Sequence, residues 1–129
     1  MESKTIVALL YDFDKTLCAQ DMQTYAFIPS LGMAPEDFWR EANAFGWQEH
    51  MDGVLAYMYT MIRKCAQLGV PLTRESLNRC GRSVTFFPGV DGWFQRINRH
   101  GERLGVQVEH YVISSGLREI IDGTAIAGA

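Results

Sequence analysis

The sequence has 129 residues, a formal net charge of −3 and 47% hydrophobic residues, which suits one globular domain or a small domain that carries an insertion. This weakly acidic balance provides no basic stripe for nucleic acid or an anionic membrane surface, so we expect small molecules or proteins as partners. The three cysteines form no CxxC pair, which argues against a disulfide framework and favours a cytoplasmic location. No apolar run approaches the roughly 20 residues that a membrane-spanning helix needs.

The first predicted element is a strand over residues 5–11, with the sequence Thr-Ile-Val-Ala-Leu-Leu-Tyr. Its hydrophobicity is continuous and does not alternate, which is typical of a parallel strand buried on both faces. The run ends abruptly in a polar cluster, Asp-Phe-Asp-Lys-Thr, at residues 12–16. We therefore expect a buried strand whose carboxyl end carries two carboxylates.

A helical block is predicted for residues 19–85. Pro35, followed by two acidic residues, is typical of a first helical turn, and the apolar residues between 55 and 66 recur at i, i+3, i+4 and i+7. Thr73 suits the N-cap of a third, short helix. We expect the aromatic side chains of this block, Trp39 and Tyr57 among them, to form mainly helical core.

The remaining elements are a helix over residues 90–104, a strand over 106–113 and a short helix over 117–121. A second polar cluster, Ser114-Ser115-Gly116, follows directly after the second strand. The order strand, helical block, helix, strand, helix predicts an α/β fold with an inserted helical piece.

The two polar clusters predict one site, because ligands of doubly wound α/β sheets bind beyond the carboxyl ends of the parallel strands. Asp12, fixed by the strand, can act as a nucleophile that forms an aspartyl-phosphate. Asp14 lies two residues further on the same side and can give and take a proton. A hard cation such as Mg²⁺, held by the side chain of Asp12 and the backbone carbonyl of Asp14, would offset their repulsion.

The second cluster suits a phosphate cradle. The hydroxyl of Ser114 and the backbone N–H groups that follow it at a helix start are donors for an anion. Either cluster alone is also typical of a solvated turn or a helix N-cap, so the functional interpretation depends on finding both in this order.

Residues 12–17 and 112–116 resemble the first and second motifs of the haloacid dehalogenase superfamily. Residues 86–90, Phe-Phe-Pro-Gly-Val, resemble the segment by which members with a helical cap return to the core. The nearest branch is the one with phosphoserine phosphatase-like caps. The resemblance implies a Rossmann-like parallel-sheet core made of residues 1–18 and 86–129, with an inserted cap of residues 19–85.

The same resemblance implies the chemical roles of individual residues. Asp12 would be the nucleophile and Asp14 the general acid/base, and both would hold Mg²⁺. Ser114 would bind the phosphate, with Ser115 and Thr16 completing the phosphate-binding set. The expected activity is hydrolysis of a phosphate monoester, with a small phosphorylated metabolite as substrate.

Two further motifs of the family, a lysine and a final group of acidic residues, normally follow the second motif at a distance. Only thirteen residues follow Gly116, and none of them is a lysine. Asp122 falls within the last expected helix and is not assigned to the metal site. We therefore expect an N-terminal fragment, and the alternative function is a catalytically incomplete fragment or interaction module that self-associates through an exposed sheet edge.

Overall fold

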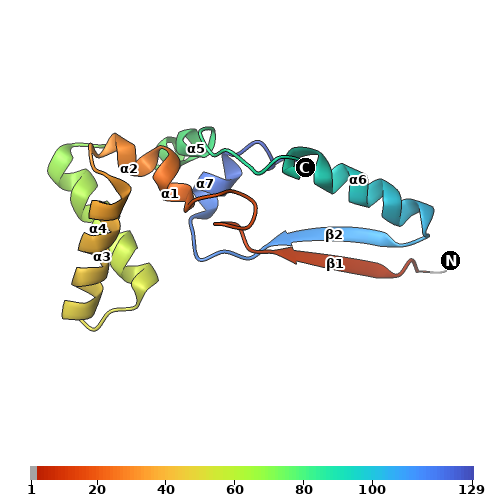
Figure 1. Cartoon of the computed structure of the whole chain (residues 1–129), viewed down its shortest axis with the longest axis horizontal. Helices are drawn as coiled ribbons and strands as arrows, with labels where there is room; N and C mark the ends of the chain where they lie inside the picture. Colours follow the sequence, from red (N-terminus) through yellow and green to blue (C-terminus); the bar gives the residue numbers. More distant parts are fainter. Residues whose placement is uncertain (1–2) are drawn as a thin grey trace.

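The structure is a computed structural model that describes residues 3–129. The molecule is elongated, with a sheet and one helix at one end and a helical hairpin at the other (Figure 1). Two strands, β1 (Ile6–Tyr11) and β2 (Gln107–Val112), form the sheet. The helices are α1 (Met22–Tyr25), α2 (Phe27–Ser30), α3 (Pro35–Gln48), α4 (Gly53–Leu68), α5 (Arg74–Gly81), α6 (Val90–Arg103) and α7 (Arg118–Asp122).

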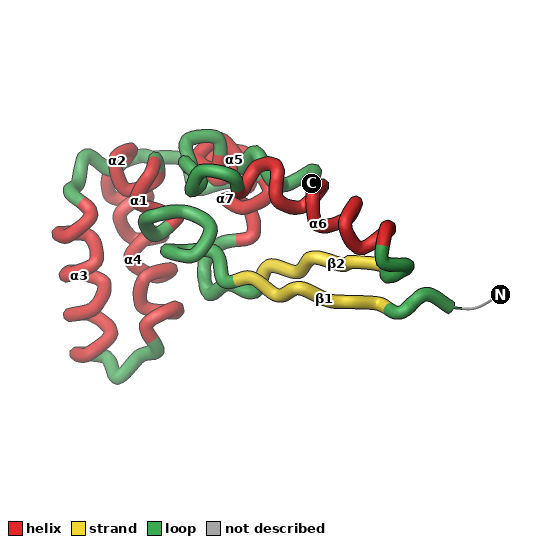
Figure 2. Tube along the Cα trace, turned by 45° about the vertical axis from the view of Figure 1, so that its right-hand side comes forward, coloured by secondary structure: helices red, strands yellow, loops and turns green. Residues whose placement is uncertain are grey.

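The sheet is parallel, with Ile6 opposite Gln107 and Tyr11 opposite Val112. Helix α6 runs back alongside the strands (Figure 2) and packs mainly against β2. The ring of its Phe94 lies 5.6 Å from that of Tyr11 on β1. The carboxyl ends of both strands point toward the helical part of the molecule (Figure 1). This arrangement confirms the predicted α/β fold, because a parallel pair of strands needs a long crossover connection, and here the helices provide it.

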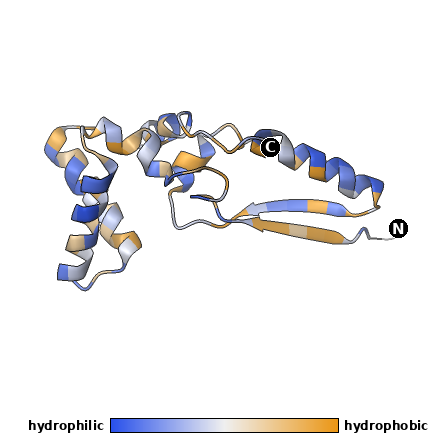
Figure 3. Ribbon diagram, in the orientation of Figure 1, coloured by the Kyte–Doolittle hydropathy of each residue, from blue (hydrophilic) through white to orange (hydrophobic). Residues whose placement is uncertain are grey.

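The burial predicted for β1 is wrong. Ile6 and Leu10 are 56% and 62% exposed, and Figure 3 shows β1 as an apolar strand that lies open along the sheet. The reason is the packing around the strand. In the described part of the chain, β2 is its one neighbouring strand, and α6 packs mainly against β2 and meets β1 at Tyr11, so the other apolar side chains of β1 have no covering layer.

The hydrophobic core lies between the sheet and the hairpin, under the loop that follows β1. Phe13, Met22, Ile28, Phe38 and Ile120 have exposed fractions of 0%. These side chains come from the loop and from four helices, α1, α2, α3 and α7, so the core fixes the loop after β1 against the helical block.

Local sequence determines where the two helices of the hairpin, α3 and α4, begin and end. Helix α3 begins at Pro35, and α4 begins where the side chain of Asp52 accepts a hydrogen bond from the Val54 N–H at 2.9 Å. Helix α4 ends at Leu68, and the next residue, Gly69, has a φ of +66°, the left-handed conformation that a glycine adopts without strain. The helix starts predicted from Pro35 and Thr73 are both confirmed.

Helices α5 and α7 approach each other closely through two glycines. A side chain at Gly81 would meet the backbone carbonyl of Ile120, and one at Gly123 would meet the backbone of Asn78. Helix α5 falls in the predicted cap and α7 in the predicted core. The proposed division at residues 18/19 and 85/86 stays a prediction.

Candidate active site

The structure brings the two polar clusters to the same edge of the sheet. The parallel pairing of Tyr11 with Val112 continues one step further, where the Ile113 N–H donates to the Tyr11 carbonyl oxygen at 2.8 Å. Asp12 and Ser114 therefore leave neighbouring strands side by side. Their positions follow the rule for α/β sheets, and their chemical roles stay predictions.

Asp12 is exposed at the end of β1 and is held by its own loop. Its Oδ1 accepts from the Phe13 N–H at 2.9 Å, and its Oδ2 accepts from the hydroxyl of Thr16 at 3.3 Å. The loop turns tightly, because the carbonyl of the buried Phe13 accepts from the N–H groups of Thr16 and Leu17, and Lys15 adopts a φ of +60°. Thr16 thus orients the carboxylate of Asp12.

Asp14 is half-buried, and its side chain reaches the start of α1. Its Oδ1 accepts from the Met22 N–H at 2.8 Å. Burial raises the pKa of this carboxyl from 3.8 to about 6, with the nearby charges of Asp21 and Asp12 adding to the rise. The hydrogen bond from Met22 and the charge of Lys15 oppose it. A carboxyl with such a pKa can carry a proton near neutral pH and can therefore act as a general acid.

The loop after β2 is held by contacts from both sides. The hydroxyl oxygen of Ser114 accepts from the Gly116 N–H at 2.9 Å, and the sulfur of Met22 lies 3.2 Å from the Leu117 nitrogen. The backbone carbonyl of Ser115 accepts from the hydroxyl of Tyr57 at 2.7 Å. Gly116 has no room for a side chain, since a Cβ there would meet the end of Met22.

The two loops open into a cleft of about 340 Å³ between the sheet edge and the hairpin. Its walls are Asp14, Asp21, Gln23, Trp39, Asn43, Asp52, Gly53, Val54, Tyr57 and Ser115. Sequence reasoning did not assign Gln23, Trp39, Asn43 or Asp52 to a site. Their residue types gave no signal, because only the packing of α1, α3 and the start of α4 around the loop after β1 brings them to the cleft.

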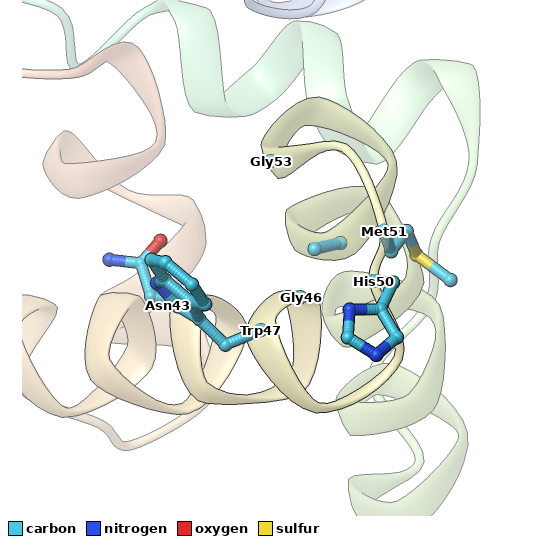
Figure 4. A pocket seen from close by; sticks show the side chains of 7 residues that line it. Asn43, Gly46, Trp47, His50, Met51 and Gly53 are labelled. Carbon is cyan, nitrogen blue, oxygen red and sulfur yellow. The ribbon is translucent and has the colours of Figure 1, made fainter.

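A second hollow, of about 350 Å³, lies at the connection between α3 and α4. Figure 4 shows its lining, to which Trp47, His50 and Met51 contribute. It shares Asn43 and Gly53 with the cleft and contains neither of the two polar clusters. The cleft beside Asp14 is therefore the better candidate for the site of chemistry.

The oxygen atoms at and near Asp12 fit part of a site for a hard cation. The carboxylate of Asp12 and the backbone carbonyl of Asp14 are oxygen ligands of the kind that Mg²⁺ takes, together with several waters. Over residues 3–129, no group of three or more His, Cys, Asp or Glu side chains gathers to hold a metal ion. The described residues thus provide some ligands of such a site without forming a closed cage.

Comparison with known proteins identifies the family. A model of the haloacid dehalogenase-like hydrolases matches residues 9–128, and the chain belongs to this family. The superfamily resemblance found in the motifs is confirmed, while the branch with phosphoserine phosphatase-like caps stays a prediction.

A relative from Borreliella burgdorferi, an uncharacterized protein, is 30% identical over 138 residues. The match covers 98% of this chain and 47% of the relative, so the chain spans about half the length of the relative it matches. No helix within the described residues is long and apolar enough to cross a membrane.

Proposed function

We propose that this chain carries the nucleophile and the acid/base of a phosphate monoester hydrolase that acts through an aspartyl-phosphate. The observation that carries the proposal is the pairing of an exposed carboxylate, Asp12, with a second carboxyl, Asp14, whose pKa is raised to about 6 by burial. The pair stands at the sheet edge where the phosphate-binding loop of Ser114 also ends. One group can attack as an anion while its neighbour holds a proton.

The reaction takes two displacements at phosphorus. A carboxylate oxygen of Asp12 attacks the phosphorus, the bond to the organic oxygen breaks, and Asp14 gives its proton to that oxygen. Asp14, now a carboxylate, takes a proton from the water that attacks the aspartyl-phosphate. This second step restores the carboxylate of Asp12 and releases inorganic phosphate.

The phosphate is held in this proposal by the hydroxyl of Ser114 and the backbone of Ser115, with Thr16 keeping the nucleophile oriented. Mg²⁺ held by the carboxylate of Asp12 and the backbone carbonyl of Asp14 would offset the negative charge that gathers when a phosphate approaches the carboxylate of Asp12. The three cysteines are free, which supports the proposed cytoplasmic location.

The decisive experiment is hydrolysis of p-nitrophenyl phosphate by this chain, with and without Mg²⁺, beside the Asp12→Asn variant. We expect turnover that needs Mg²⁺ and falls at least about a hundredfold in the variant, because a neutral amide is a poor nucleophile. Turnover that is the same in Asp12→Asn would refute the assignment of the nucleophile.

Asp14→Asn separates the two steps. Nitrophenolate is a good leaving group, so phosphoryl transfer to Asp12 proceeds without the proton of Asp14, whereas hydrolysis of the intermediate loses its base. We expect this variant to accumulate phosphorylated protein, detected as a mass increase after acid quench and located at Asp12 by borohydride reduction and peptide mapping. A variant that hydrolyses the ester as fast as the wild type would contradict the role of Asp14.

The second candidate function is an interaction module, and the exposed side of β1 favours it. Ile6, Val7 and Leu10 are 56%, 39% and 62% exposed on an edge strand, where unpaired backbone groups can join another strand. The proposed partner is a second copy of the chain. Sedimentation velocity over a hundredfold range of concentration tests this, with Val7→Lys expected to shift the chain toward the monomer.

A further inference from the structure

Tyr11 is the last residue of β1 and directly precedes Asp12. On this largely exposed strand, the side chain of Tyr11 is half-buried against α6. Its ring meets that of Phe94 edge-on, with 5.6 Å between the ring centroids, and its hydroxyl accepts from the indole N–H of Trp93 at 2.9 Å. Tyr11 therefore ties the end of β1, from which Asp12 leaves, to the helix that packs against the sheet.

Hydrogen bonds continue from this hydroxyl into β2 and back to α6. The Tyr11 hydroxyl oxygen lies 2.8 Å from His110 Nδ1, and His110 Nε2 lies 2.8 Å from Asn98 Oδ1. An indole N–H can only donate and an amide oxygen can only accept, so the two ends fix the direction of the chain. The hydroxyl of Tyr11 donates to Nδ1, and the hydrogen on Nε2 is donated to Asn98. We call the four residues Trp93, Tyr11, His110 and Asn98 the Tyr11 clamp.

Protonation of His110 would break the Tyr11 clamp. A hydrogen on Nδ1 would meet the hydroxyl hydrogen of Tyr11, so the hydroxyl would have to turn and would lose its acceptor. The contact between the end of β1 and α6 is thus complete while His110 is neutral and is weakened when the ring takes up a proton.

The surroundings of His110 favour the neutral ring. It stacks on the ring of Tyr11 at 5.8 Å, and its polar neighbours, the Tyr11 hydroxyl from β1 and Asn98 from α6, carry no charge. Glu109 lies on the other face of β2, where it accepts from the hydroxyl of Tyr111 at 2.6 Å, and the arginines of α6 line a separate hollow. Burial lowers the pKa of His110 from its ordinary 6.5, and no charged side chain among the described residues contributes to the shift.

We propose that Tyr11 is a positioning residue for Asp12 and that the protonation state of His110 controls how firmly Tyr11 is held. With His110 neutral, the Tyr11 clamp fixes the end of β1 against α6, and Asp12 leaves that end at the candidate site. A nucleophile that is slightly displaced loses rate without losing affinity for the ester. This inference rests on the proposed function in one respect, because it treats the positioned carboxylate as the nucleophile.

The test is an NMR titration of the ¹⁵N-labelled chain from pH 8 to pH 4.5, in buffer without divalent cations. It follows the ring nitrogens of His110, assigned through His110→Gln, and the backbone amide of Asp12. We expect the ring to carry its hydrogen on Nε2 at pH 8, and part of the Asp12 amide shift to follow the titration of His110. Tyr11→Phe keeps the ring and both carboxylates of the site but removes the hydroxyl, so this part of the shift should disappear. An Asp12 amide that titrates identically in Tyr11→Phe would overturn the proposal.

Asn98→Asp tests the same coupling without touching Tyr11. The new carboxylate beside Nε2–H should raise the pKa of His110 by about one unit, because an opposite charge favours the protonated ring. The part of the Asp12 amide shift that follows His110 should move to higher pH by the same amount. If it stayed in place while the pKa of His110 rose, the proposal would be overturned even if Tyr11→Phe failed to fold.

Kinetics provide a second measurement. In hydrolysis of p-nitrophenyl phosphate at pH 7.5, Tyr11→Phe should lower kcat about fivefold and change KM less than about twofold. Tyr111→Phe is the matched control, because it removes a hydroxyl from the other face of the sheet, where the partner is Glu109, and it should leave both constants unchanged. An equal loss of kcat in the two variants would contradict a specific role of Tyr11.

The outcome is separable from that of the proposed function. Hydrolysis that depends on Asp12, with kcat unchanged in Tyr11→Phe, would leave the phosphatase intact and remove the positioning role. An Asp12 amide coupled to His110, without phosphoryl transfer to Asp12, would refute the phosphatase and leave the Tyr11 clamp as the device that holds this carboxylate.

Discussion

Because the pKa of Asp14 is raised, the ionisation of this residue at neutral pH lowers the free energy of unfolding. An ionised Asp14 is held half-buried in the fold, whereas the same carboxylate is hydrated in the unfolded chain. A rise of the pKa from 3.8 to about 6 corresponds to at most about 3 kcal/mol, at 1.36 kcal/mol per unit. Because the group keeps some contact with water, we expect about 1–2 kcal/mol.

The pH range follows from the two pKa values. Between about pH 4 and pH 6 the folded chain holds a proton on Asp14 that the unfolded chain has lost, so the stability falls as the pH rises through this range. Above about pH 6, Asp14 is ionised in the folded and the unfolded chain, and the whole loss of stability is present. Asp14→Asn keeps an oxygen that can accept from the Met22 N–H but does not ionise, and we therefore expect the variant to be more stable than the wild type at pH 7.5 and equal to it near pH 4.

The assay is urea unfolding followed by circular dichroism at pH 4, 5, 6 and 7.5, in buffer without divalent cations, for the wild type and Asp14→Asn. Asp91→Asn serves as a control for the loss of one exposed carboxylate. The reasoning would be refuted by a variant that is no more stable than the wild type at pH 7.5. A gain in stability of the same size at every pH would also refute it, because that gain would not come from ionisation.

Two further predictions concern contacts that join distant segments. Tyr57→Phe removes the hydrogen bond to the Ser115 carbonyl and should lower the free energy of unfolding by about 1 kcal/mol, measured by urea denaturation. Faster amide hydrogen exchange in the loop of Ser115 should accompany it, and unchanged exchange there would contradict the contact. Gly81→Ala places a methyl group against the backbone carbonyl of Ile120 and should cost about 2 kcal/mol or more, whereas Gly128→Ala, with nothing within 4 Å, should change the stability by less than about 0.5 kcal/mol.

Local patterns in the sequence were sufficient to predict both strands, the helices α3 to α7 and the positions of the two polar clusters, whereas α1 and α2 were predicted only as part of a helical block. The strand before Asp12 ends where its apolar run ends, and α4 and α5 begin at side chains that cap their own first turns. These features depend on residues a few positions apart, so the sequence displays them directly. The adjacency of Asp12 and Ser114 also followed, because parallel strands of one sheet end at a common edge.

Packing between segments that are distant in the sequence determined which residues reach the site and which apolar residues are buried. Tyr57 looked like helical core, yet its hydroxyl reaches Ser115, 58 positions further along the chain. Gln23 falls in the block predicted to be helical, and only the structure shows that its side chain is buried in the wall of the cleft. The burial of an apolar residue such as Leu10 also depends on which surfaces come to cover it. A hydrophobic stretch of sequence indicates that its burial would be favourable. Which segments cover it, and whether any do, is determined only when the helices pack against the sheet.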